Sequence, residues 1–391
     1  MNILFYYSIT ANPQHGGIAK VTLQLCKTLI NRGHSVFIIS STKTAESVVH
    51  YQYYLPDEKN FLSKKNEEFF NRFINEYKID ICVSQNGNAP DHNEAITWCN
   101  KLNIPIVTVV HSSLSGMYGI GSRMNPFHST LKKLHLYNIG DKMFQYLFKR
   151  KYGEWYKYQG MNSDSIVLLS EKFKDEYYYY SNTKGDKVLN IPNMLTLQNN
   201  PTDIPKNKKK IVLFVGRISY EKQVDKLLEI WNQVYKEFPE WNLKIVGDVS
   251  HGSSKILTDL KETAISMGLK RYSFEGYNNP EPYYNEASVF CLTSSFEGFG
   301  LVLIEAMAYG TVPIAFNSYA SASEIIDDNI NGVLVKPFSI KEYANKLRLL
   351  MSNDSLRHTM SIDAKNKSTF YSPDRIATEW ESLFRKMINN K

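Results

Sequence analysis

The sequence has little that would indicate a membrane-embedded, secreted or metal-binding chain. It contains only four cysteines (Cys26, Cys82, Cys99 and Cys291), with no CxxC pair and no metal-ligand spacing. One of the longest apolar runs, residues 104–110, has seven residues, far short of the roughly 18 that a membrane-spanning helix needs. The first residues lack the basic and apolar regions of a signal peptide. We therefore expect a reduced, cytoplasmic compartment.

Two common nucleotide-binding fingerprints are also missing. The first apolar run is followed by Gly16-Gly17 rather than by a full GxGxxG motif, and no Walker A loop is present. These absences argue against a nicotinamide dehydrogenase or an ATPase. A glycine pair at the start of a helix can still bring backbone amides close to a phosphate, although many such pairs are plain turns.

The composition is that of a globular protein. The 391 residues are 43% hydrophobic and 22% charged, which excludes a disordered or collagen-like chain and predicts two or three domains. The 46 basic and 39 acidic side chains leave a net charge of +7. This excess favours an anionic partner, and nucleic acid, a membrane surface and a nucleotide ligand all satisfy it.

Short apolar runs alternate with amphipathic stretches along the whole chain, which predicts an α/β fold with parallel sheets. The predicted strands are 3–7, 35–40, 79–84, 104–110, 165–169, 187–191, 211–215, 243–246, 289–293, 311–316 and 332–335. Helices are expected from Gly17 to about Arg32 and over 224–238.

Residues 192–210 interrupt this pattern with three prolines, several asparagines and three consecutive lysines, which is typical of a linker. The strand, glycine loop and helix that open the chain then recur after residue 210. We predict two doubly wound, Rossmann-like domains, 1–192 and 193–372, that face each other across a cleft. Ligands of such sheets bind at the carboxyl ends of the strands.

The segment 120–159 is strongly basic and rich in aromatic residues. Its charged residues are Arg123, Lys132, Lys133, Lys142, Lys149, Arg150, Lys151 and Lys157 against Asp141 and Glu154. Such a surface can lie on anionic lipid, and it can equally be a solvated helical face.

Two cations follow the first strand of the second half. Arg217 comes directly after Gly216, and Lys222 follows five residues later. At the carboxyl end of a parallel strand they could hold a diphosphate, whereas most such pairs are solvated surface charges. His111 follows the strand 104–110 in the same way, and a lone histidine is more often structural.

Two glutamates flank the start of a third predicted helix. Glu297 and Glu305 are eight residues apart, with Gly298 and Gly300 between them and an apolar run from Leu301. We expect Glu297 in a loop, a helix from near Leu301, and Glu305 in its early turns. The two carboxylates could then accept hydrogen bonds from sugar hydroxyls, with free helix amides near a phosphate. Because Glu297 is a loop residue, we expect its removal to lower turnover far more than stability.

These motifs resemble those of the retaining glycosyltransferases of family 4, which have the GT-B fold. The E-x7-E stretch over 297–310 carries the resemblance, supported by Gly16-Gly17, by the cluster from Gly216 to Lys222, and by residues 331–335. The sequence departs from the family pattern at Gln223, at Met194 and in 321–324, where the family often has glycine. The last helix, about 373–391, would pack back on the N-terminal domain.

The resemblance implies roles for the candidate residues. Arg217 and Lys222 would hold the donor diphosphate, Glu297 would bind the donor sugar, Glu305 would bind the ribose, and His111 would lie beside the sugar. The expected catalytic residues are Glu297, His111, Arg217 and Lys222. The expected donor-binding residues are Gly16, Gly17, Arg217, Lys222, Glu297, Phe299, Gly300, Leu301 and Glu305.

The implied activity is retaining, metal-independent transfer of a sugar to a glycan or lipid-linked acceptor, in cell-surface polysaccharide or glycolipid assembly. A UDP-sugar is the first candidate donor, and it is a substrate, so no cofactor and no nucleic-acid partner are expected. The protein would be cytoplasmic, with the inner face of the plasma membrane as a further location. A nucleotide-sugar epimerase, a phosphorylase, a glycosidase and a non-catalytic sugar-nucleotide binding protein stay open as alternatives.

Overall fold

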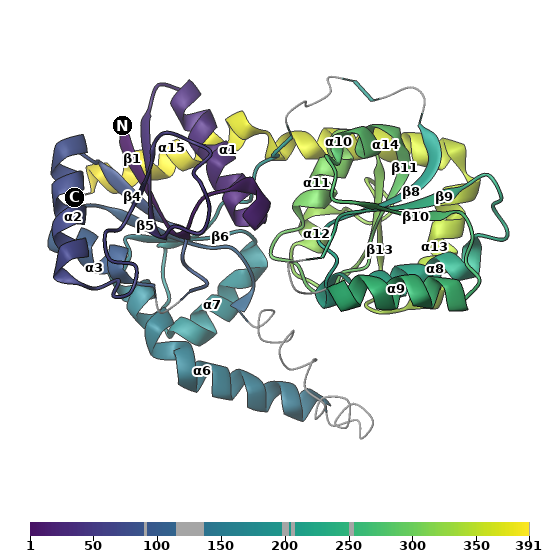
Figure 1. Ribbon diagram of the computed structural model, residues 1–391, viewed down its shortest axis with the longest axis horizontal. Helices are drawn as coiled ribbons and strands as arrows, with labels where there is room; N and C mark the ends of the chain where they lie inside the picture. Colours follow the sequence, from purple (N-terminus) through teal and green to yellow (C-terminus); the bar gives the residue numbers. More distant parts are fainter. Residues whose placement is uncertain (90–91, 115–136, 198–202, 205–207, 250–253, 391) are drawn as a thin grey trace. The chain divides into compact units, whose positions relative to one another are not determined.

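The computed structural model describes residues 1–89, 92–114, 137–197, 203–204, 208–249 and 254–390. The chain forms two compact units: unit 1 comprises 1–196 with 373–391, and unit 2 comprises 197–372. The boundary expected from the sequence lies four residues earlier, at 192. Figure 1 shows that each unit is a sheet with helices on both of its faces.

Unit 1 contains a parallel sheet with the strand order β3-β2-β1-β4-β5-β6-β7. The strands are β1 (Asn2–Ile9), β2 (Ser35–Thr42), β3 (Gln52–Tyr54), β4 (Ile81–Ser84), β5 (Ile106–Val110), β6 (Ser165–Leu168) and β7 (Val188–Asn190). The central strands β4, β5 and β6 are buried along their whole length. Continuous apolar runs are expected where helices cover both faces of a sheet.

The helices of unit 1 cover this sheet with amphipathic faces. Its longer helices are α1 (Gly17–Asn31), α2 (Lys64–Tyr77), α3 (Glu94–Lys101), α6 (Tyr137–Asn162), α7 (Lys174–Ser181) and α15 (Pro373–Asn389). In α1 the buried residues include Ala19, Leu25, Cys26 and Leu29, which follow the three- and four-residue spacing of one helix face.

The last helix, α15, belongs to unit 1 although it follows unit 2 in the chain. Glu381 of α15 accepts a hydrogen bond of 2.9 Å from Arg32 Nε, and it lies 2.9 Å from His34 Nε2. The hydrogen bond from Arg32 lowers the pKa of Glu381 to about 2. Because Arg32 and His34 adjoin the end of α1, these contacts fix α15 against that helix.

Unit 2 contains a second parallel sheet, in the order β10-β9-β8-β11-β12-β13. Its strands are β8 (Lys209–Val215), β9 (Asn242–Val246), β10 (Tyr272–Gly276), β11 (Ala287–Leu292), β12 (Val312–Phe316) and β13 (Val333–Val335). Its helices are α8 (Val224–Val234), α9 (Ser254–Ser266), α10 (Glu281–Glu286), α11 (Leu301–Ala308), α12 (Ala322–Ile325), α13 (Ile340–Ser352) and α14 (Asp354–Ser368).

These observations confirm the predicted α/β class with two Rossmann-like sheets. The eleven predicted strands all have counterparts, with ends that shift by one or two residues. Two strands were missed, β3 and β10. Both are sheet edges, and β10 is only partly buried throughout, so neither carries the apolar run that marked the other strands. The helix predicted over 224–238 ends as an α-helix at Val234.

The basic segment 120–159 falls only partly within the described residues. Its first part, 120–136, lies outside them, and the rest belongs to α6. Tyr156 and Gln159 of α6 are buried, and Tyr158 bonds to Thr97 of α3 through their hydroxyls, 2.8 Å apart. The C-terminal half of α6 is therefore part of the packed body of unit 1.

Candidate active site

The strand order reverses at the first strand of each sheet. β1 lies between β2 and β4, and β8 lies between β9 and β11. Ligands of doubly wound sheets bind beyond the carboxyl ends of the strands at such a reversal. The predicted site residues follow these strands or others of the same sheets: Gly16 and Gly17 follow β1, His111 follows β5, Arg217 and Lys222 follow β8, and Glu297 follows β11. They form two groups, one in each unit.

In unit 2 the structure brings Lys222 and Glu297 into direct contact. Lys222 Nζ lies 2.6 Å from Oε1 and 2.7 Å from Oε2 of Glu297, and the Ser294 hydroxyl donates a 2.6 Å hydrogen bond to Oε1. The two side chains are only 16% and 10% exposed. Removal of Glu297 would leave a largely buried ammonium group without this carboxylate, so we expect it to cost stability as well as turnover. Which loss is larger stays a prediction.

Arg217 is paired in a similar way. Its guanidinium donates a 3.0 Å hydrogen bond to Glu221, one helical turn further along the chain. Burial alone would raise the pKa of Glu221, but the nearby Ser219 hydroxyl and the hydrogen bond from Arg217 hold it below its usual value. The Arg217 side chain is 61% exposed, so it can turn toward a ligand at little cost. Both predicted cations thus lie next to a carboxylate with which an anionic ligand would compete.

The loop that carries Glu297 leads directly into α11. Gly300 is the residue before the helix, and α11 begins at Leu301, so the predicted helix start and the helical position of Glu305 are confirmed. The buried hydroxyl of Ser321 donates a 2.8 Å hydrogen bond to the Phe299 carbonyl. This serine lies in the segment that departs from the family pattern. The Ser321 hydrogen bond therefore holds the loop that carries Glu297. This loop ends at the first turn of α11, where backbone amides lack helical partners.

Glu305 is held apart from the contact between Lys222 and Glu297. It is 4% exposed, and its Oε2 accepts a 3.0 Å hydrogen bond from Tyr284. Burial, with Glu305 nearby, raises the pKa of Tyr284 well above its usual value, so this phenol stays a donor. Tyr309 and Glu281 make a parallel contact of 3.1 Å. The ribose-binding role of Glu305 stays a prediction.

The structure explains why glycine suits the position after Lys222. Gln223 has φ 49° and ψ 48°, in the left-handed region that most side chains avoid. The Thr293 hydroxyl donates to the carbonyls of both Lys222 and Gln223, at 3.0 and 3.1 Å. Thr293 follows β11, and this contact fixes the backbone beside Lys222 in spite of the strained residue.

In unit 1, the glycine pair forms the junction between a short 3-10 helix (Pro13–His15) and α1. Gly16 has φ 116°, which strongly favours glycine, and Gly17 is the first residue of α1. Both are exposed. The start of α1 is therefore accessible to solvent, and its phosphate-binding role stays a prediction.

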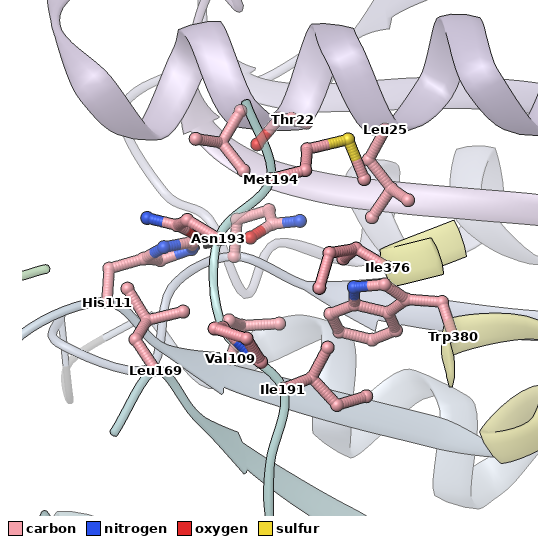
Figure 2. A pocket seen from close by; sticks show the side chains of 13 residues that line it. Thr22, Leu25, Val109, His111, Leu169, Ile191, Asn193, Met194, Ile376 and Trp380 are labelled. Atoms are coloured by element: carbon pink, nitrogen blue, oxygen red, sulfur yellow. Dashed lines mark hydrogen bonds between the residues drawn. The ribbon is translucent and has the colours of Figure 1, made fainter. Parts of the chain in front are cut away.

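His111 lines a small pocket in unit 1, as Figure 2 shows. Its Nε2 lies 2.5 Å from Oε1 of Gln85, and its backbone amide donates to Asn88 Oδ1 at 2.6 Å. Burial lowers the pKa of His111 to about 3, so the ring is neutral near pH 7. Since the amide oxygen of Gln85 only accepts, Nε2 carries the proton and Nδ1 is the acceptor.

The sequence reasoning missed the partners of His111. Gln85 and Asn88 belong to the run Gln-Asn-Gly-Asn after β4, which pairs with β5. Amide side chains directly after a buried strand were the signal that could have indicated them. Met194, which departs from the family pattern, also lines this pocket, together with Asn193, Ile376 and Trp380.

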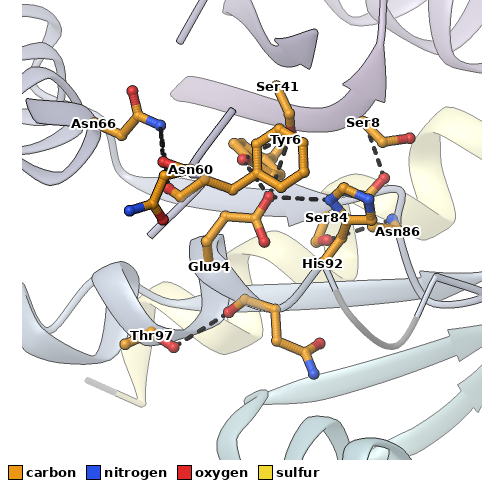
Figure 3. A network of polar contacts seen from close by, with 12 residues as sticks. Tyr6, Ser8, Ser41, Asn60, Asn66, Ser84, Asn86, His92, Glu94 and Thr97 are labelled. Atoms are coloured by element: carbon orange, nitrogen blue, oxygen red, sulfur yellow. Dashed lines mark hydrogen bonds and ion pairs between the residues drawn. The ribbon is translucent and has the colours of Figure 1, made fainter. Parts of the chain in front are cut away.

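A second polar cluster lies deeper in unit 1 and was also missed. Figure 3 shows Glu94, at the first position of α3, among Tyr6, Ser41 and His92. Its Oε1 accepts hydrogen bonds of 2.7 Å from Tyr6 and 3.3 Å from Ser41, and His92 lies 3.4 Å away. Glu94 is 2% exposed. The cluster ties α3 to β1 and β2, and so supports the strand ends that carry the loops.

Within the described ranges, no three His, Cys, Asp or Glu side chains are arranged to hold a metal ion. In that same part of the chain, no helix combines the length and the apolar character needed to cross a bilayer. The four cysteines are buried and form no disulfide.

Two family models match consecutive parts of the chain. The model described as Glycosyltransferase Family 4 matches residues 15–198, and the model described as Glycosyl transferases group 1 matches residues 198–367. Their common border lies next to the boundary between units 1 and 2. The chain belongs to the family-4-like glycosyltransferases of the GT-B type.

Individual relatives of this glycosyltransferase are known from sequence. An uncharacterized glycosyltransferase of Haemophilus influenzae is 33% identical over 227 residues, which are 56% of this chain and 61% of that protein. A Campylobacter jejuni alpha-1,4-N-acetyl-D-galactosaminyltransferase is 28% identical over 226 residues, or 58% of this chain and 61% of that protein. The name of that relative specifies a glycan that is linked to PP-undecaprenol. The chain thus matches about three fifths of the length of these two relatives.

Solved structures with the same fold include HepE of Anabaena in complex with UDP. It superimposes with a TM-score of 0.74 over 99% of this chain and 100% of that chain, at 17% sequence identity. At this level of identity the likeness concerns the GT-B fold.

Proposed function

We propose that this glycosyltransferase moves a sugar from a nucleotide-sugar donor to a glycan or lipid-linked acceptor, with retention at the anomeric carbon. The observation that carries the proposal is the grouping of Arg217, Lys222 and Glu297 on the loops after β8 and β11 of unit 2. Two cations and a carboxylate at a strand-order reversal match a ligand that carries both phosphates and sugar hydroxyls.

In the proposed reaction, the bond between the anomeric carbon and the diphosphate breaks, and the electron pair stays on the diphosphate. The acceptor hydroxyl oxygen bonds to the same carbon, and its proton passes to the departing diphosphate. Negative charge develops on the leaving group, so Arg217 and Lys222 lower the barrier by stabilising it. When the diphosphate takes over the contact with Lys222, Glu297 becomes able to accept hydrogen bonds from the donor sugar.

The remaining residues would position the donor. The amides around Phe299, Gly300 and Leu301 would contact its sugar and phosphates. Glu305 would bind the ribose hydroxyls after its hydrogen bond from Tyr284 breaks. In unit 1, the Gly16-Gly17 loop would approach the diphosphate. His111, neutral at Nδ1, would accept a hydrogen bond from a sugar hydroxyl.

The donor and the acceptor are proposed from relatives. UDP is bound in the structure of Anabaena HepE, which supports a UDP-sugar as the first candidate donor. The name of the Campylobacter relative supports a lipid-linked glycan as acceptor, in cell-surface polysaccharide or glycolipid assembly. We further propose that the reaction needs neither a metal ion nor a cofactor and takes place in the cytoplasm.

A screen of nucleotide-sugars by thermal shift and by hydrolysis tests the donor assignment. One donor class should raise the melting temperature and be hydrolysed slowly without acceptor. Arg217→Ala and Lys222→Ala should each weaken binding of that donor and slow turnover by about 10²- to 10³-fold. Lys255→Ala on the exposed face of α9 is the matched control and should behave as wild type. Wild-type rates in both Arg217→Ala and Lys222→Ala would refute the assignment of these cations to the donor diphosphate.

Product analysis separates the alternatives. With a labelled donor, transfer puts the label on the acceptor, whereas an epimerase returns it in a new nucleotide-sugar. NMR of the product then reports whether the anomeric configuration of the donor is kept. A protein that binds nucleotide-sugars and yields neither product would be a non-catalytic binding protein.

A further inference from the structure

The exposed face of α6 and α7 in unit 1 has an unusual composition. Among the described residues, six of the exposed large apolar or aromatic side chains lie on these two neighbouring helices, and they are 44 to 64% exposed. They are Met143, Tyr146, Leu147, Trp155 and Met161 of α6 and Tyr179 of α7. Single exposed apolar residues are ordinary on protein surfaces, but a group on adjoining helices indicates an interaction surface.

Three of these residues, Met143, Leu147 and Met161, lie on one stripe along α6 together with two charged residues, whereas Trp155 lies about 120° round the helix from that stripe. Met143, Leu147, Arg150, Glu154 and Met161 follow one another at intervals of four, three, four and seven residues. At about 100° per residue, these positions lie within roughly 40° of one line along the helix. The opposite side of α6, which includes Tyr156 and Gln159, is buried in unit 1. Figure 1 shows the first turns of α6 extending away from the sheet of unit 1.

Positive charge accompanies the apolar residues. Between residues 145 and 162, α6 carries Lys149, Arg150, Lys151 and Lys157 against Glu154 alone, a net charge of +3 (4 − 1). Glu154 lies 3.6 Å from Lys157, so its charge is already balanced locally. Lys149 and Lys151 lie over aromatic rings, 4.3 Å from that of Tyr179 and 4.8 Å from that of Tyr152. Arg150 and Lys157 lie on the same side of α6 as Met143 and Leu147. Lys149 lies about 120° round the helix from Met143, where it also donates a 2.8 Å hydrogen bond to Asn182 Oδ1.

We propose that this surface of α6 and α7 docks unit 1 on an anionic lipid membrane. Aromatic, Leu and Met side chains would enter the headgroup boundary, while the long Lys and Arg side chains keep their charges at the phosphates. The helix would lie on the bilayer, since its many charged residues exclude a spanning position. The docking is independent of sugar transfer, although it would bring the enzyme of the proposed function to a lipid-linked acceptor.

Charge decides between lipid and a second copy of the chain as the occupant. Two copies that met through this surface would place the same excess of cations against each other, which costs free energy. An anionic leaflet instead attracts each exposed cation by about 1 kcal/mol, or roughly five-fold in affinity. The apolar residues add the area that a purely electrostatic contact lacks.

Flotation of the full chain with vesicles, without any donor, tests the proposal. Binding is expected to vesicles of phosphatidylcholine with about 30% phosphatidylglycerol and not to phosphatidylcholine alone. Raising the salt from about 0.05 M to about 0.5 M should weaken it, because salt screens the charges. Absence of binding to the anionic vesicles at low salt would overturn the proposal, and the surface would then be a solvated face or a site for an acidic protein.

Paired variants locate the contact. Arg150→Gln with Lys151→Gln should weaken binding to anionic vesicles by about 25-fold, which is five-fold for each cation. Lys255→Gln with Lys261→Gln, on exposed positions of α9 in unit 2, removes the same charge and should leave binding unchanged. Equal losses in the two pairs would refute a specific role for α6.

The apolar contribution needs its own variant. Met143→Gln with Leu147→Gln keeps every charge, should weaken vesicle binding, and should leave the melting temperature within about 1 °C because both side chains are exposed. Donor hydrolysis in solution should be unchanged in all these variants. Vesicle binding that is lost while hydrolysis persists supports the docking surface, whereas lost hydrolysis with intact vesicle binding would concern the proposed function alone.

Discussion

The contact between Lys222 and Glu297 should support both the stability of unit 2 and its turnover. Three variants separate these effects: Lys222→Met, Glu297→Gln and the double variant. Each single variant removes one charge and keeps approximately the shape of the side chain. The double variant removes both charges, so it leaves no ion without its partner.

The magnitude follows from the burial of the pair. Removing one partner of a fully buried ion pair costs about 3 to 5 kcal/mol, and an exposed pair contributes about 0 to 1 kcal/mol. With exposed fractions of 16% and 10%, we expect each single variant to lose about 2 kcal/mol. This corresponds to a melting temperature about 4 to 8 °C lower for a unit of this size. The double variant should recover about 1 kcal/mol of the summed losses.

Turnover should respond differently from stability. We expect each single variant to lose about 10²- to 10³-fold in rate, since one removes the cation proposed to stabilise the leaving group and the other removes the carboxylate proposed to bind the donor sugar. The double variant should be no slower than the slower single variant, because residues that act as a unit are not additive. Thermal melts and donor hydrolysis on the same samples measure both quantities. Single variants that melt like wild type would show that the pair contributes nothing to folding, and unchanged rates would remove it from the active site.

Three further perturbations test other parts of the structure. The lowered pKa of Glu381, about 2 against about 4.5 in the unfolded chain, makes its contribution to stability present above about pH 4.5 and lost toward pH 2. The difference in melting temperature between wild type and Glu381→Gln should therefore shrink from pH 5 to pH 3. The pKa of His111 is about 3 in the folded protein against about 6.5 in the unfolded chain. As the pH falls, the unfolded chain binds the proton first, so wild type should lose stability below about pH 6.5. His111→Asn should flatten that loss in pH-dependent melts. A Cβ at Gly247 would overlap the Gly216 carbonyl, at a φ of 135°, so Gly247→Ala should destabilise unit 2 by about 2 to 4 kcal/mol in denaturant titrations.

The sequence predicted those features that depend on local pattern. Buried strands are visible in the sequence as apolar runs. Gly298 and Gly300 before Leu301 correctly predicted where α11 begins. The positions of Arg217, Lys222 and Glu297 at strand ends followed from the same pattern. Edge strands such as β3 escaped because a short, half-exposed strand has no such run.

Pairing across the chain was beyond the reach of local pattern. Lys222 and Glu297 are 75 residues apart, and Arg32 and Glu381 are 349 apart, yet both pairs are in hydrogen-bond contact. The partners of His111 were missed for the same reason, since Gln85 is 26 residues away on a neighbouring strand. These contacts add an expected stability role for Glu297, and the Gln85 contact selects the tautomer of His111; both depend on what lies nearby in space.

The return of α15 to unit 1 has a consequence for the order in which the protein can mature during synthesis. Ile376, Trp380 and Phe384 are buried on unit 1, so that unit lacks part of its core until the ribosome has made α15. Unit 2, which is continuous in sequence, can complete its own core earlier. Its residues 197–372 are thus topologically a domain inserted into unit 1. A nascent chain that stalls before residue 373 would hold a finished unit 2 and a unit 1 with exposed apolar surface, the state that chaperones bind.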